Sequence, residues 1–227
     1  MFKNRSYTKE LLDGDNIPEN DLYQNLKELN TINKLLGGYA ISFNALNKIL
    51  IKNKPFTLVD IGCGGGDTLK QIEHWNKKQN YLLNLVGVDL KQTCIDYSIK
   101  NNSTHIKFIC DDYKNVLNHI AKIDILHACL FCHHLSEIEI IELIKFCNQH
   151  KIILVINDLE RNAIAYFAIK LLTVLFSKSY LVKNDAPLSV LRGFKKREWK
   201  LILQQAEVKK YSINYKWAFR HEVIVYA

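Results

Sequence analysis

The chain has 227 residues, which is long enough for one sizeable α/β domain and too short for two. Its 48% hydrophobic and 24% charged content, with three prolines and nine glycines, excludes a largely disordered protein, so we expect disorder only in about the first dozen residues. The formal net charge is +8, but the lysines are spread along the chain, which favours a basic surface over a nucleic-acid partner.

The N-terminal residues Lys3, Arg5 and Lys9 are not followed by an apolar stretch of the signal-peptide type, so we expect a cytoplasmic protein. The six cysteines lie mostly in apolar runs, where a reduced thiol acts as a small hydrophobic group. No disulfide framework is predicted.

Two helical stretches come first. Apolar residues recur every three or four positions over 21–36, and a second helical stretch over 40–52 ends before Pro55. We therefore expect residues 1–52 to form an N-terminal helical cap on a main domain that comprises residues 53–227.

Five short β-rich runs follow, and helical stretches separate them. The runs are 56–61, 82–89, 106–110, 123–130 and 151–157, and the helices are 67–78, 92–101, 137–149 and a short one near 113–120. This alternation predicts a parallel sheet built from βαβ units, which is an α/β, doubly wound architecture.

Residues 161–176 are apolar almost all round a predicted helix, which must then be covered on several sides. A polar segment over 177–192, a helix over 195–206 and two strands within 208–227 complete the chain. We expect residues 160–194 to form a helical lid insertion.

The apolar helix is shorter than the roughly 20 residues that cross a bilayer. Three roles remain open for it: lining a pocket for an oily ligand, resting on a membrane surface beside Lys170, Lys178 and Lys183, or being buried in a cap or dimer contact. A monomer and a homodimer both remain open.

A glycine-rich loop follows the first predicted strand. Gly62, Gly64 and Gly66 stand between an apolar strand and a helix that opens at Asp67, which lets the main chain approach a ligand closely. Nicotinamide and flavin enzymes share such loops. However, Asp60 would repel a pyrophosphate, whereas it suits a ligand that carries an amino group and a sulfonium.

Acidic residues also follow the next two strands. Asp89 ends the second strand, where a carboxylate can accept hydrogen bonds from both ribose hydroxyls of an adenosine. Asp111, or its neighbour Asp112, follows the third strand and is placed to meet an adenine amino group. The alternatives are that Asp60 caps the glycine turn and that Asp111 or Asp112 caps the next helix.

The segment from Val59 to Gly66 resembles motif I of class I S-adenosylmethionine (SAM)-dependent methyltransferases. The resemblance continues through Gly87-Val88-Asp89, Cys110-Asp111-Asp112, residues 130–135 and residues 193–208. It implies SAM as cofactor and a three-layer, seven-stranded, mostly parallel Rossmann-like sheet whose last strand is antiparallel. The implied cofactor-binding residues are Asp60, Gly62, Cys63, Gly64, Gly66, Asp89, Leu90, Asp111, Asp112 and Leu130.

Residues 157–161, the apolar helix and residues 185–189 also resemble small-molecule methyltransferases found beside bacterial polyketide-type synthases. This implies methyl transfer to a small lipophilic acceptor, phenolic or polyketide-like, with O-methylation favoured over C-methylation. The alternatives are an RNA methyltransferase and a non-catalytic SAM-binding regulator. No Asp-Pro-Pro-Tyr-type segment follows the fourth strand, which disfavours the nucleic-acid reading.

Methyl transfer from a sulfonium is an in-line displacement for which positioning supplies much of the rate and which needs no metal. A base would help a phenol or enol acceptor, and His133 and His134 are the first candidates, although they also fit a wall beside the cofactor. Asp158 and Glu160, with Arg161 nearby, face the same opening or cap the next helix.

Arg192 either holds an anionic oxygen or is a solvated charge. Cys129, Cys132 and the two histidines formally match haem-attachment and zinc patterns. We disfavour both, because no export signal is expected and strand alternation aims these side chains apart, so no metal is expected.

Overall fold

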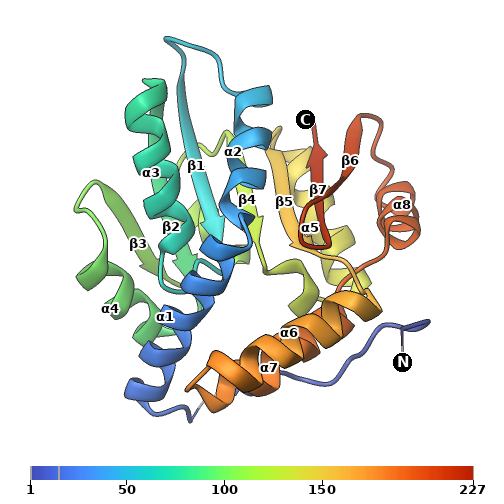
Figure 1. Cartoon of the computed structure of the whole chain (residues 1–227). Coiled ribbons are helices and arrows are strands. Elements are labelled where there is room, and N and C mark those ends of the chain that lie inside the picture. The colour runs from blue at the N-terminus through green and yellow to red at the C-terminus, as the bar shows by residue number, and fades with distance from the viewer. Residues whose placement is uncertain (1, 15, 227) are drawn as a thin grey trace.

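The computed structural model describes residues 2–14 and 16–226, and its centre is a seven-stranded sheet in the order β3-β2-β1-β4-β5-β7-β6 (Figure 1). The strands are β1 (Pro55–Ile61), β2 (Leu82–Asp89), β3 (Ile106–Cys110), β4 (Ile125–Cys129), β5 (Ile153–Leu159), β6 (Tyr211–Lys216) and β7 (Arg220–Val225). The pairs among β1 to β5 are parallel, and β7 is antiparallel to both β5 and β6. The predicted doubly wound, seven-stranded, mostly parallel sheet is therefore confirmed.

Helices cover both faces of this sheet. The α-helices are α1 (Glu19–Leu35), α2 (Gly38–Ile49), α3 (Asp67–Gln79), α4 (Gln92–Asn101), α5 (Glu137–Gln149), α6 (Ala163–Phe176), α7 (Tyr180–Arg192) and α8 (Lys196–Gln205). Short 3-10 helices are η1 (Leu11–Asp13), η2 (Tyr113–Asn118) and η3 (Cys132–His134).

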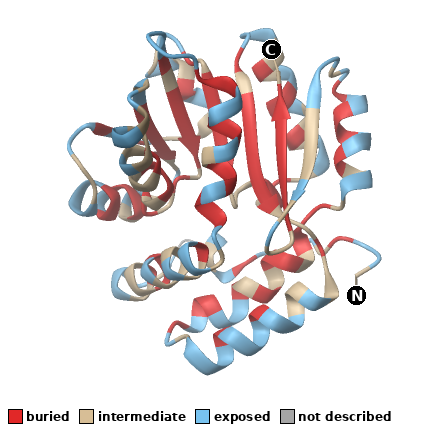
Figure 2. Cartoon of the chain, turned by 45° about the horizontal axis from the view of Figure 1, so that its top comes forward, coloured by how far each residue is buried: buried red, intermediate tan, exposed pale blue. Residues whose placement is uncertain are grey.

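The two layers of core follow from the period of two along each strand. In β1, Phe56 and Leu58 pack with α2, α3 and α4, whereas Val59 and Ile61 belong to the opposite cluster with α5 and α8. Strands β1, β4 and β5 are buried on both faces (Figure 2), which is why they read as continuous apolar runs.

Two expectations about the outer elements are wrong. The N-terminal segment packs into the molecule, because buried Arg5 donates to the backbone oxygens of Arg192, His133 and Leu135. The polar segment over 177–192, part of the expected helical insertion over 160–194, is mostly helix α7 despite Pro187, because Leu181, Val182 and Val190 are buried and outweigh the missing proline donor.

The second correction concerns α6, which is not covered on several sides. Only Ile169 and Thr173 of this helix are buried. Its outer face exposes Ile164, Phe167, Leu171, Leu172, Val174, Leu175 and Phe176. Helix α7 packs on one side only, and in the part of the chain that the structure describes no helix combines the length and apolar character needed to cross a bilayer.

Candidate functional site

A cavity of about 930 Å³ lies where the parallel strands end, and both the glycine loop and the N-terminal segment line it. The carboxyl ends of β1 and β4 meet at the centre of the sheet, where the chain changes direction, and such a switch point is where open α/β sheets bind ligands. One half of the wall comes from the loops after β1 to β4. The other half comes from α1, η1, α6, α7 and the hairpin between β6 and β7.

The glycine loop exposes main chain to this cavity. Gly62, Gly64 and Gly66 have φ of 62°, 53° and 72°, in the left-handed region that favours glycine. A Cβ at Gly62 would lie 2.2 Å from the Phe131 ring, whereas one at Gly64 would meet only Leu26, at 3.5 Å. The glycine at position 62 is thus required by packing against Phe131, whereas Gly64 leaves space on the cavity side for a ligand to approach its main chain. Cys63 lines the cavity between them, and burial raises the pKa of its thiol.

Asp89 binds the loop directly. One carboxylate oxygen accepts from the N–H of Gly64 and the other from the N–H of Lys91, each at 2.9 Å. Burial raises the pKa of Asp89, while these two N–H groups pull it down. A carboxylate has about four lone-pair sites, so room remains for hydroxyl donors of a ligand. Leu90 beside it is exposed and lines the same wall.

Asp60 lies beneath the loop and is absent from the cavity wall among the described residues. It is 2% exposed and accepts from Nδ1 of His127 at 2.7 Å, while Nε2 of His127 pairs with Ser42 at 2.9 Å. These hydrogen bonds tie β1 to β4 and α2. Asp60 therefore holds the base of the loop in the orientation that its main chain needs.

Asp111 and Asp112 both line the cavity after β3. Hydrogen bonds from Asn115 at 2.9 Å and from His119 at 2.6 Å hold the pKa of Asp111 below its usual range. Asp112 accepts from the N–H of Lys114 and caps η2, as the capping alternative predicts. Leu130, with φ of 53°, lies opposite them on the wall.

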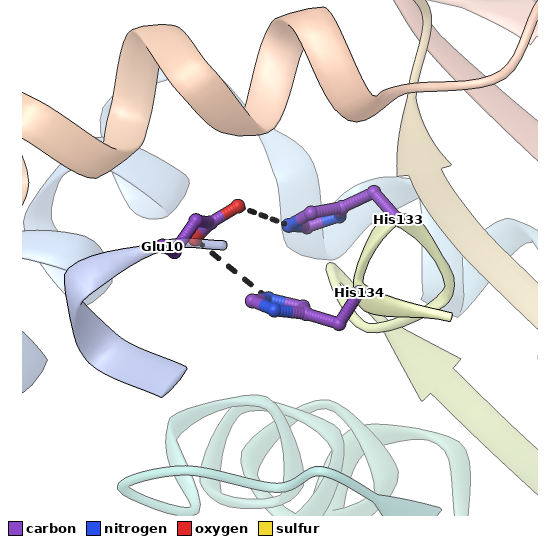
Figure 3. A group of neighbouring side chains, drawn as sticks. All are labelled: Glu10, His133 and His134. Carbon is purple, nitrogen blue, oxygen red and sulfur yellow. Dashed lines mark ion pairs between the residues drawn. The ribbon is translucent and has the colours of Figure 1, made fainter. Parts of the chain in front are cut away.

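The two histidines form a cluster with Glu10 at the other end of the cavity (Figure 3). His133 contacts Asp158 through Nδ1 at 2.7 Å and through its main-chain N–H at 2.9 Å. His134 contacts Asp13 through Nδ1 at 2.9 Å. Both Nε2 atoms therefore point the other way, 3.6 Å and 3.9 Å from the Glu10 carboxylate.

Burial raises the pKa of the acidic side chains in this cluster unless hydrogen bonds or nearby positive charge outweigh it. It raises the pKa of Glu10 to about 7, against the pull of His134, Ser189 and Arg192. At Asp158 burial acts in the same direction, but His133 and two N–H donors hold the pKa below its usual range. Asp158 is 1% exposed and lies behind His133, so it does not face the opening as the sequence suggested.

The remaining polar candidates, Arg192, Arg161 and Glu160, contact other protein groups. Buried Arg192 donates to the carbonyl oxygens of His133 and His134 and to Asp13, which excludes both predicted roles, an anion holder and a solvated charge. Arg161 is paired with Glu198 at 2.5 Å, and Glu160 lies 3.9 Å from His221.

Sequence reasoning missed Glu10 and Asp13, because residues 1–12 were expected to be disordered. The local signal is the spacing of Glu10 and Asp13, which are one helical turn apart. In the structure, the main-chain N–H groups of Leu11 and Leu12 between them donate to the buried Asp185 of α7 at 2.8 Å. Only the fold brings this turn opposite η3.

No protein-family model and no curated protein sequence matches the chain. Solved structures do. The plantazolicin methyltransferase BpumL, in complex with a triazolic desmethylPZN analog and SAH, superposes with a TM-score of 0.66 at 17% identity, over 91% of this chain and 90% of that one.

Two further structures have the same architecture. A SAM-dependent methyltransferase from Aquifex aeolicus matches with a TM-score of 0.58 at 14% identity, over 92% of this chain and 98% of that one. The citrinin polyketide synthase CMeT domain gives 0.55 at 13% identity, over 82% of this chain and 50% of that one. The chain therefore has the Rossmann-like α/β fold of the SAM-dependent methyltransferases.

Proposed function

We propose that this protein transfers a methyl group from SAM to a small lipophilic acceptor, with an oxygen as the favoured methyl-accepting atom. The observation that carries the proposal is the single cavity that joins the glycine loop and Asp89 to the cluster of His133, His134 and Glu10. One end has the features of a nucleoside and amino-acid site, and the other offers groups that activate an acceptor.

The cofactor end fits SAM better than a dinucleotide. Asp60 beneath the loop, Asp89 on the loop and Asp111 on the wall place three carboxylates around it, and carboxylates repel pyrophosphate. In the proposal, the Gly62–Gly66 main chain and Cys63 hold the methionine part. Asp89 binds the ribose hydroxyls, and Leu90, Asp111, Asp112 and Leu130 surround the adenine.

The acceptor end supports a small, oily molecule. Besides Leu26 near the glycine loop, Leu29 and Ile32 of α1 and Ala165, Ala168 and Ile169 of α6 line the cavity with apolar surface. An apolar wall binds carbon-rich molecules by removing their surface from water. In the proposal His133 and His134 activate the acceptor oxygen, and Asp158 positions His133. The exposed apolar face of α6, with Lys170 and Lys178 close by, fits contact with a membrane surface from which such a molecule is collected.

The transfer depends mainly on alignment of the acceptor oxygen with the methyl carbon of SAM. The acceptor oxygen attacks the methyl carbon, the bond from that carbon to sulfur breaks, and its electron pair returns to sulfur. Enclosure of the reacting atoms excludes water and aligns them, which accounts for much of the rate.

Calorimetry with SAM and a radiolabelled-methyl assay test this proposal. We expect SAM to bind one site and label from SAM to enter the organic phase when lipid extract or a phenol panel is offered. Label in total RNA would instead favour a nucleic-acid methyltransferase, and binding without any turnover would favour a regulator. Asp96→Ala, an exposed acid of α4, is a matched control for Asp89→Ala in both measurements.

A further inference from the structure

Glu10, His133 and His134 have the arrangement of a metal site at the acceptor end of the cavity (Figure 3). The three side chains come from two places far apart in the sequence, the N-cap of η1 (Glu10) and η3 (His133 and His134), and meet at one point. One ligand atom of each lies within 4.8 Å of the others. We propose that these three residues bind one divalent cation of the zinc type and leave a further coordination position open to the cavity.

The orientation of both imidazoles supports this proposal. A histidine that ligates a metal through one nitrogen usually engages its other nitrogen with a carboxylate or carbonyl, which fixes the ring. Here both Nδ1 atoms contact carboxylates, His133 that of Asp158 at 2.7 Å and His134 that of Asp13 at 2.9 Å. Each ring therefore presents Nε2 to the same space.

The distances also fit a cation between the groups. The Nε2 atoms are 3.6 Å and 3.9 Å from the Glu10 oxygens, which is too long for hydrogen bonds. Two ligand atoms on a tetrahedral zinc, each about 2.0–2.1 Å from the metal, are about 3.4 Å apart. Each imidazole is thus within about half an ångström of this separation from one of the two Glu10 oxygens, and one ligand atom of each residue lies within 4.8 Å of the others, so side-chain movements would close the three groups on one ion.

Charge in the surroundings favours a dication. Glu10, Asp13, Asp158 and Asp185 contribute four carboxylates around the cluster, and Arg5 and Arg192 contribute two guanidinium groups. With neutral imidazoles and an ionised Glu10, both of which metal binding requires, the carboxylates outnumber the guanidinium groups by two, and a divalent cation balances this excess.

The ligand set indicates the use of the site. Two histidines and one glutamate with an open position are the protein ligands of zinc sites that bind and activate an oxygen. This part of the inference rests on the proposed function. An acceptor hydroxyl on the cation has a lowered pKa, its proton leaves to water, and the oxygen lone pair then attacks the methyl carbon while the electron pair of the carbon–sulfur bond returns to sulfur. An Nε2 that coordinates the cation cannot also take the proton, so this mechanism differs from base catalysis by the imidazole.

Metal binding is tested without any assay of turnover. The chelator-treated full-length protein is titrated with Co²⁺ alone, whose visible absorption reports nitrogen and oxygen coordination, and Zn²⁺ is then added as a competitor. We expect saturation at one equivalent and displacement by Zn²⁺. His134→Ala and Glu10→Gln should abolish the signal, and Asp13→Asn should weaken binding about 10- to 100-fold. His74→Ala, which removes an exposed histidine of α3, should leave it unchanged.

SAM affinity and thermal melting of each variant show that it is folded. No saturable Co²⁺ signal in the wild type, or equal signals in the wild type and folded His134→Ala, would overturn the proposal. If metal-free protein binds SAM and methylates an acceptor as fast as zinc-loaded protein, the cation has no part in activation while the proposed function stands. If Co²⁺ binds as expected and SAM does not bind, the metal site stands and the proposed function fails.

Discussion

Gly62 is constrained both by its own backbone and by the side chain of Phe131. Its φ of 62° costs any other L residue about 1–2 kcal/mol, and an added Cβ would also collide with the Phe131 ring. Gly37 has nearly the same backbone, with φ of 66°, but apart from its own chain neighbours no atom of residues 2–14 and 16–226 lies within 4 Å of its added Cβ. Substitution of Gly37 therefore reports the energetic cost of the backbone conformation alone, and substitution of Gly62 adds the cost of the clash with Phe131.

We predict that Gly62→Ala lowers the free energy of unfolding by about 1–3 kcal/mol more than Gly37→Ala, because only the first variant overpacks the loop. Urea denaturation of both variants measures the difference. Equal losses would mean that Phe131 moves aside at no cost.

Asp89 is the residue on which the cofactor assignment depends most. In Asp89→Ala we expect SAM affinity to fall by about 1–3 kcal/mol, because charge-assisted hydrogen bonds to ribose are lost. Calorimetry on a folded variant measures this, and Asp96→Ala should keep the wild-type affinity. Unchanged affinity in Asp89→Ala would refute the assignment.

At the scale of elements, the N-terminal segment is fastened by Arg5. Its guanidinium donates to the main-chain oxygens of Arg192, His133 and Leu135 at 2.5–2.7 Å and thereby ties the strand-like start of the chain to η3 and α7. The segment carries Glu10 into the site.

Arg5→Ala should therefore lower the free energy of unfolding by about 1.5–3 kcal/mol, since hydrogen bonds from a charged donor to buried oxygens are lost. Lys9→Ala, which removes an exposed cation of the same segment, should change it by less than about 0.5 kcal/mol. Chemical denaturation followed by circular dichroism compares them. Equal effects would show that the segment is not anchored through Arg5.

Strand β7 carries a histidine that makes stability depend on pH. His221 is buried, and neither ring nitrogen has a hydrogen-bond partner among residues 2–14 and 16–226. Burial and the charge of Lys196 lower its pKa from 6.5 to about 4. Between these values the unfolded chain binds the proton and the folded chain does not, so stability is lost as pH falls from about 6.5 toward 4.

We predict that this histidine makes the protein about 2 kcal/mol less stable at pH 5 than at pH 7. The substitution His221→Phe should reduce the pH dependence by that amount, whereas His74→Ala should not. Urea titrations at the two pH values measure it. The same dependence in wild type and His221→Phe would assign it to other groups.

At the scale of the whole molecule, the proposed ligand links binding to stability. A ligand at about 100 times its dissociation constant stabilises the folded state by about 2.7 kcal/mol, which for a chain of this size raises Tm by about 5–10 °C. We expect that shift with SAH and none with NAD or ATP, whose phosphates meet the carboxylates around the glycine loop. A larger shift with NAD would mean that the cavity holds a dinucleotide.

The cations behind the overall charge of +8 are spread along the sequence, and acidic residues outnumber basic ones in the cavity lining, so we expect a basic surface rather than a nucleic-acid partner. Retention on heparin or RNA should vanish at modest salt. The exposed apolar face of α6 is the larger departure from an ordinary surface, and vesicle binding together with measurement of the oligomeric state tests whether a membrane or a second copy covers it.

The sequence by itself determined the sheet and the loop. The short apolar runs, the glycines at 62, 64 and 66 and the acids at or beside the ends of β1, β2 and β3 are local signals, because each depends only on neighbouring residues and on where a strand stops. Boundaries such as Leu82–Asp89 and Glu137–Gln149 agree with the predicted ones for this reason.

Tertiary structure alone decided which groups meet. Glu10 and His133 are far apart in the chain, and their contact depends on Arg5, Asp185 and Arg192 fastening the N-terminal turn over η3. Asp158, which we expected to face the cavity, instead binds His133 and fixes the orientation of its ring. Most of the segment over 177–192 is helical, and this helix buries Leu181 and Val182. Such outcomes follow from long-range packing and desolvation, which no local pattern of residues encodes.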